Sequence, residues 1–279
     1  MAGMMFDRSR IGRRSHLAEA DFLHTFAAEE IVDRLSLVSR TFKEGLAVGP
    51  LTPAIEAAWA AAPVRWTTLT PPFGPMGMVV ADEAMPVFRA VGLTVSINHL
   101  HLSNDPVAML TQLRGTLRPD GLFLGAALCS GTLAELTEVM LEADAQTGAG
   151  AGLRVAPFAD VRRWGDAVSR AGFALPVADA LTITVRYKTL LSLFQDLGHM
   201  GVRGILASRS PGRRRLFEKA SDLYAERHSD PDGRLRATFS FAFLSGWAPD
   251  ASQQKPAKRG SATVRLEDAL KAPLVPKSR

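Results

Sequence analysis

Apolar and polar positions along the chain follow two spacings, and residues 94–128 show both most clearly. Asp105 and Pro106 predict the start of a helix, because a short acceptor side chain caps free N–H groups and proline fits the first turn. Apolar side chains then recur at helical spacing, at Val107, Leu110, Leu113 and Leu117. Residues 122–128 are apolar throughout, which is typical of a strand covered on both faces. The pattern therefore predicts a strand, a helix and a second strand of an α/β sheet.

The same two spacings predict the remaining elements. Helices are expected within residues 16–37, 53–59, 132–145, 158–171 and 190–224, and strands at 46–48, 64–69, 78–81, 181–187 and 237–247. A turn is expected at residues 118–121, between the central helix and the strand after it. Two late strands with helices between them predict an edge pair with a helical insertion at about residues 188–228. We expect one domain over residues 1–249 and a polar tail over 250–279.

Composition narrows the class of protein. The chain has 279 residues, of which 47% are hydrophobic, so it can bury a full core. Its net charge of +5 favours acidic partners without requiring nucleic acid. Cys129 is the only cysteine, which excludes an internal disulfide and a cysteine-based zinc site. No apolar run is long enough to span a membrane, so a soluble cytoplasmic protein is expected; the Arg-rich residues 8–14 leave the mitochondrial matrix as an alternative.

Candidate ligand-binding residues follow the predicted strands, because open α/β sheets bind ligands at the carboxyl ends of their strands. Gly49 joins the first strand to a helix, a geometry that can hold a phosphate or ribose, although a plain turn has the same sequence. Asp82 and Glu83 end the strand at 78–81. Their carboxylates are placed to accept hydrogen bonds from an adenine or a ribose, or to cap a surface helix.

Candidate catalytic residues follow the strand that begins at Thr94. His101 and Asp105 are the nearest candidates for a general base. Asp105 also has a capping role, and His101 can be a structural histidine. His99 shares one face of the strand with His101, but no distant third ligand completes a metal site, so no metal is expected.

The whole pattern resembles the class I S-adenosylmethionine (SAM) methyltransferases. More narrowly, it resembles the methyltransferase-like assembly factors of respiratory complex I, which are related to the malonyl-carrier-protein O-methyltransferases. The residues that carry the resemblance are 6–8, 80–86, 96–105, 117–123, 230–239, 246–249, 252–256 and 260–262.

The resemblance implies a Rossmann-like fold with a seven-stranded, mostly parallel sheet, an antiparallel C-terminal strand and a helical insertion. It implies SAM as the cofactor, with Gly49, Asp82, Glu83 and Ser96 at the positions that hold it. It also implies a protein or carrier-bound substrate and a complex I subunit as the candidate partner. Gly49, Asp82 and Ser96 are then expected to converge on one rim of the sheet.

Three features of the family are altered here. Pro50, Leu51 and Thr52 occupy places where the family has glycines, no acid follows the second strand, and Leu102 replaces a tryptophan. Two functions therefore stay open: a SAM-dependent methyltransferase, and a non-catalytic assembly or scaffold factor with a degraded SAM site. A nucleic-acid-binding module is the weakest alternative, because the basic clusters lack interleaved aromatic residues.

Overall fold

The computed structural model describes residues 5–7, 10, 22–69, 90–148, 152–200, 202–208, 212 and 214–253. The chain divides into two compact units, Met1–Pro249 and Asp250–Arg279. All the helices and strands below belong to the first unit.

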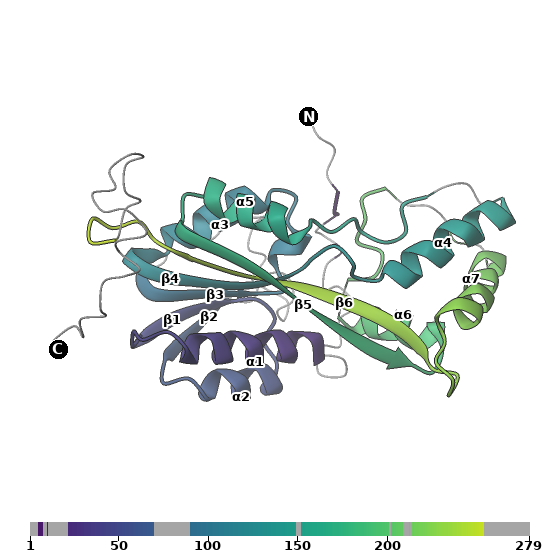
Figure 1. Cartoon of the computed structure of the whole chain (residues 1–279), viewed down its shortest axis with the longest axis horizontal. Helices are drawn as coiled ribbons and strands as arrows, with labels where there is room; N and C mark the ends of the chain where they lie inside the picture. Colours follow the sequence, from purple (N-terminus) through teal and green to yellow (C-terminus); the bar gives the residue numbers. More distant parts are fainter. Residues whose placement is uncertain are drawn as a thin grey trace, which may run out of the picture. The chain divides into compact units, whose positions relative to one another are not determined.

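One mixed sheet forms the centre of this unit (Figure 1). Its strands are β1 (Glu44–Val48), β2 (Arg65–Leu69), β3 (Val91–Ile97), β4 (Leu117–Leu128), β5 (Ala174–Tyr187) and β6 (Leu235–Trp247). They lie in the order β2-β1-β3-β4-β6-β5. The pairs among β1 to β4 are parallel, and β6 is antiparallel to both β4 and β5. The Rossmann-like sheet with an antiparallel C-terminal strand is thus confirmed. The described residues form six strands instead of seven, and the strand predicted at residues 78–81 lies outside them.

Helices cover both faces of the sheet. They are α1 (Phe22–Ser36), α2 (Pro53–Ala60), α3 (Pro106–Gly115), α4 (Ala134–Thr147), α5 (Val161–Arg170), α6 (Leu190–His199) and α7 (Arg214–His228), with a 3-10 turn at Leu100–Leu102. Figure 1 shows α1 and α2 on one face and α3 and α5 on the other. Two apolar clusters result: Ile31 and Ile55 pack with one face, and Leu110 and Trp164 with the other.

The central strand, helix and strand are confirmed, with one correction at the predicted turn. Asp105 caps α3, since its Oδ1 accepts a hydrogen bond from the Ala108 N–H at 2.9 Å. The helix ends at Gly115, and β4 already begins at Leu117. The turn expected at residues 118–121 is instead an irregularity within β4, where the register with β3 shifts and Asp120 has a φ of 58°. Two of the residues predicted to stop the helix, Pro119 and Asp120, therefore form this irregularity.

The insertion between β5 and β6 consists of two helices, α6 and α7. Helix α7 packs against α4 (Figure 1). Tyr224 fixes α7 to the sheet, because its ring is fully buried and its hydroxyl donates a hydrogen bond to the Arg236 carbonyl at 2.8 Å. Together α4, α6 and α7 extend the fold beyond the carboxyl ends of β3 and β4.

Candidate functional site

The carboxyl ends of β1 and β3 lie side by side. Val48 of β1 is opposite Ser96 of β3, and Gly49 follows directly. Gly49 has a φ of 151°, and a Cβ atom there would lie 2.6 Å from the Ile97 carbonyl oxygen. Only glycine fits this approach of two backbones without strain. Gly49 and Ser96 therefore share one rim, as the family resemblance implies.

Ser96 is fully buried within the sheet. Its Oγ has no hydrogen-bond partner among the described residues. Asp82 and Glu83 lie outside the described residues, so the predicted convergence is seen for Gly49 and Ser96 alone. The cofactor-binding roles of all four residues stay predictions.

The loop after Gly49 offers few hydrogen-bond donors to a cofactor. Pro50 has no N–H group. Thr52 uses its hydroxyl inside the fold, where the Oγ1 accepts a hydrogen bond from the Ile55 N–H at 3.3 Å and caps α2. Leu51 is half-buried against the apolar core. The described residues of this loop keep the close backbone approach but do not fit the polar, amino-acid end of SAM.

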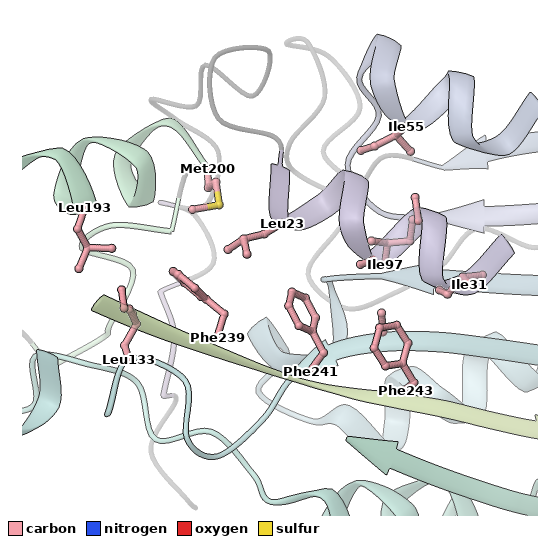
Figure 2. Packing of buried hydrophobic residues seen from close by; sticks show 14 of the residues in the cluster. Leu23, Ile31, Ile55, Ile97, Leu133, Leu193, Met200, Phe239, Phe241 and Phe243 are labelled. Carbon is pink, nitrogen blue, oxygen red and sulfur yellow. The ribbon is translucent and has the colours of Figure 1, made fainter. Parts of the chain in front are cut away.

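A cavity of about 800 Å³ lies beyond the ends of β3 and β4. It is bounded by the start of α1, by α4 and the chain after it, and by α6 and α7. Most of the lining is apolar, and the apolar residues include Leu23, Leu128, Leu133, Leu136, Met140, Leu153, Phe158, Leu191, Phe194, Leu197, Met200, Ile205, Phe217 and Phe239. Figure 2 shows Leu23, Leu133, Met200 and Phe239 gathered from four different segments. The volume is in the range of ligand-binding pockets in proteins.

The open side of the cavity carries apolar side chains in contact with solvent. Leu153, Leu191 and Phe217 line the cavity and are 42%, 62% and 40% exposed. We call these three residues the apolar rim. One wall beside the rim is held by a buried ion pair, in which Arg154 binds both carboxylate oxygens of Asp144, at 2.8 and 2.7 Å. This pair ties the chain after α4 back to that helix.

The buried end of the cavity includes His101. The Nδ1 atom of His101 accepts a hydrogen bond from the Leu128 N–H at 3.2 Å, which places the ring proton on Nε2. Burial, followed by the nearby His24 and His99, lowers the pKa of His101 to about 3. His101 is therefore neutral at physiological pH and has a donor at Nε2. This geometry favours hydrogen-bond donation over the predicted role of a general base.

Asn98 also lines the cavity, and the sequence analysis did not single it out. Its φ is 46°, a left-handed conformation that asparagine tolerates better than most residues. The Nδ2 group donates to the Leu23 carbonyl at 3.2 Å and to the Nδ1 of His24 at 3.0 Å. The Oδ1 atom is buried and has no hydrogen-bond partner in the described part of the chain. The sequence feature that could have identified Asn98 is its position as a polar residue directly after β3.

Asp105 lies apart from this arrangement. It is exposed, caps α3, and is not among the described residues that line the cavity. The described residues contain no group of three or more His, Cys, Asp or Glu side chains that could hold a metal ion. None of the described helices is long and apolar enough to cross a membrane.

Comparison with known proteins identifies relatives of the chain, although no family model matches it. A zebrafish (Danio rerio) protein named arginine-hydroxylase NDUFAF5, mitochondrial, is 30% identical over 288 residues, which cover 96% of this chain and 90% of that protein. A malonyl-[acyl-carrier protein] O-methyltransferase of Laribacter hongkongensis is 32% identical over 182 residues, covering 64% and 59% of the two chains. Among solved structures, a putative methyltransferase from Bacillus halodurans is 13% identical with a TM-score of 0.48, covering 80% of this chain and 99% of that one.

The zebrafish relative aligns along nearly the whole of both chains. The strand order and the antiparallel last pair agree with the fold that the sequence resemblance implies. The chain belongs to the family of NDUFAF5, the methyltransferase-like assembly factors of respiratory complex I.

Proposed function

We propose that this protein acts in the assembly of respiratory complex I by binding an apolar segment of a protein subunit. The observation that carries the proposal is the cavity of about 800 Å³ with its apolar rim, Leu153, Leu191 and Phe217. Exposed apolar side chains grouped at the mouth of a pocket are typical of binding sites. Membership of the NDUFAF5 family supports a role in complex I assembly. The zebrafish relative is named an arginine-hydroxylase, and this name favours a protein as the substrate.

The charges around the cavity define the partner further. Three arginines line it, Arg154, Arg203 and Arg214, against a single described carboxylate, Glu218. Arg154 is paired with Asp144, and Arg214 with Glu218. Arg203 is exposed and has no ion-pair partner among the described residues. The proposed segment therefore carries an acidic residue beside its apolar part.

Copurification from the protein's own cell tests the assembly role. The tagged chain is expected to bring complex I subunits with it. The variant Leu191→Asp places a charge on the rim and is expected to lower their yield at least tenfold. Leu37→Asp is the matched control, because Leu37 is 85% exposed and does not line the cavity. Absence of complex I subunits, or equal yields for the two variants, would contradict the proposal.

A second candidate function is SAM-dependent methyl transfer to a protein or carrier-bound substrate. The observation that favours it is the preserved approach of Gly49 to Ile97, and the Laribacter relative is named a methyltransferase. The poor fit of Pro50 and Thr52 predicts a SAM dissociation constant no tighter than the high micromolar range. Calorimetric titration measures it, and saturation at low micromolar SAM would favour this second function over the first.

A further inference from the structure

A second cavity, of about 710 Å³, lies where the parallel strands begin, at the opposite end of β3 and β4 from the apolar cavity. Four of the described residues that line it are basic, and two are acidic. The basic residues are Arg40, Lys43, Arg65 and Arg118, and the acidic residues are Glu44 and Asp120. We call this cavity the basic pocket. Its described lining carries more positive than negative charge, which favours an anionic ligand.

The irregularity in β4 shapes the basic pocket. The register of β3 with β4 shifts between Val91 and Leu93, and residues 118–121 are the extra residues of β4. Gly92 and Gly121 both line the pocket, and a Cβ atom at Gly121 would lie 3.1 Å from the Gly92 carbonyl oxygen. The two backbones approach closely here, and neither glycine adds a side chain to the pocket. This arrangement leaves space above the start of β3.

Two of the four basic side chains are paired with the carboxylates of the pocket. Arg40 donates hydrogen bonds to the Asp120 carbonyl at 2.6 Å and to the Asp120 carboxylate at 2.5 Å. Arg65 forms an ion pair with Glu44. Because each carboxylate already has a basic partner, the charge of the other two basic side chains is left uncompensated.

Those two side chains, Lys43 and Arg118, are exposed. The Arg118 guanidinium reaches across the start of β3, where its Nη2 lies 3.8 Å from the Glu44 carboxylate in β1. It donates no hydrogen bond to any residue that the structure describes, and Lys43 forms no ion pair with these residues. A guanidinium with available N–H groups binds a carboxylate through two parallel hydrogen bonds. Arg118 and Lys43 can therefore bind carboxylates from another molecule.

We infer that the basic pocket binds an acidic segment of a partner protein, with one carboxylate on Arg118 and a neighbouring one on Lys43. Nucleic acid fits less well, because Glu44 and Asp120 would repel a continuous phosphate chain. The one aromatic residue in the described lining, Phe42, is only 7% exposed and offers no face for a base to stack on. The inference uses no residue of the apolar cavity and does not rest on the proposed function.

Three fluorescent probes test the inference: the peptide N-acetyl-(Glu-Ala)₄-amide, the same peptide with glutamine in place of glutamate, and an oligothymidylate of eight nucleotides. Fluorescence anisotropy measures their binding to the full chain in low salt at pH 7.5. The glutamate peptide is expected to bind about fivefold more tightly than either other probe, since exposed ion pairs contribute about 0.2–1 kcal/mol each. Equal affinities, tighter binding of the oligonucleotide, or no binding of the glutamate peptide would overturn the inference.

Charge reversal at Arg118 shows whether the pocket or the overall charge binds the peptide. Arg118→Glu is expected to weaken the glutamate peptide about tenfold. Arg162→Glu is the matched control, because Arg162 is exposed on α5 and does not line the pocket. It is expected to change the affinity less than about twofold, because salt screens a distant charge. Equal losses in the two variants would contradict a site at Arg118.

Removing the carboxylate beside Arg118 gives a second reading if the charge reversal disturbs folding. Glu44→Gln is expected to strengthen binding of the glutamate peptide about threefold, because Arg65 and Arg118 no longer face a competing carboxylate. Asp166→Asn removes one negative charge from α5, outside the pocket, and is expected to have no effect. Weaker binding in Glu44→Gln, or equal gains in both variants, would overturn the inference. Leu191→Asp is expected to leave peptide binding unchanged, so this inference and the assembly role can fail independently.

Discussion

The end of β1 and the end of β3 lie side by side at one edge of the sheet, yet they provide different atoms for a ligand. After β1, Gly49 allows two backbones to approach closely, but Pro50 has no N–H and the Thr52 hydroxyl is used to cap α2. After β3, Asn98 and His101 keep hydrogen-bonding atoms beside a cavity of about 800 Å³. The end of β1 offers a close backbone approach with few donors, whereas the end of β3 has hydrogen-bonding side chains beside a cavity.

This difference shows which features the fold itself requires. Gly49 is required because a Cβ atom at this position would lie against the Ile97 carbonyl oxygen. Its presence therefore does not by itself indicate a cofactor. Asn98 is a different case, because its left-handed backbone and its buried, unpartnered oxygen each cost about 1–3 kcal/mol. The hydrogen bonds from its Nδ2 group to Leu23 and His24 explain how the side chain is attached to α1. They do not explain why the Oδ1 atom is left without a partner. The contacts of the fold therefore do not explain this buried oxygen.

The largest effect is expected on the cavity wall. Asp144→Ala removes the two carboxylate contacts that Asp144 makes to the Arg154 guanidinium, which is only 9% exposed. Breaking a buried ion pair from one side costs about 3–5 kcal/mol, so the free energy of unfolding should fall by about that amount in urea titrations. Glu218→Ala breaks an exposed pair and should change little. Similar losses for the two variants would mean that the wall does not depend on the buried pair.

A smaller effect is expected at the rim of β1. Gly49→Ala places a Cβ against the Ile97 carbonyl and should lower the free energy of unfolding by about 2–3 kcal/mol, with or without SAM. Gly148→Ala is the matched control, since Gly148 has a φ of 64° but no atom within 4 Å of the added Cβ. It should cost about 1 kcal/mol. If both variants lose the same amount, the contact between β1 and β3 does not explain the glycine.

Local patterns in the sequence predicted most of the fold. Asp105 caps the helix that it was expected to start, because a cap needs only the residues next to it. Residues 118–121 were assigned to a turn, but pairing with β3 places them in β4. This error has a physical reason, since strand pairing depends on residues far away in the chain.

The candidate site was predicted less completely. The family resemblance implied that Gly49 and Ser96 lie on one rim, and the parallel pairing of β1 with β3 places them on neighbouring strand ends. It did not single out Asn98, whose importance depends on contacts with Leu23 and His24. The pair of Asp144 and Arg154 was also missed, because it closes across a loop whose path the local pattern does not determine.

The pH dependence of stability tests the neutral state of His101. Its pKa of about 3 in the folded chain lies below the ordinary value of 6.5, so the unfolded chain binds a proton first as the pH falls. This contribution is fully present above pH 6.5 and is lost toward pH 3, by about 1.4 kcal/mol per pH unit. The measurement is the difference in unfolding free energy between the wild type and His101→Phe at pH 7 and pH 5.5. A difference that does not change with pH would contradict a buried neutral histidine.

The smallest effect concerns the missing donor after β1. Pro50→Ala restores one backbone N–H beside Gly49, and one added hydrogen bond contributes about 1 kcal/mol. SAM should then bind about fivefold more tightly in calorimetric titrations. Pro63→Ala is the control, because Pro63 is exposed and follows the other end of α2, where no cofactor contact is expected. Unchanged affinity in Pro50→Ala would show that the loop lacks more than a donor. The β1 side would then have lost the conformation of a cofactor loop as well, and the contrast with the β3 side would be sharper.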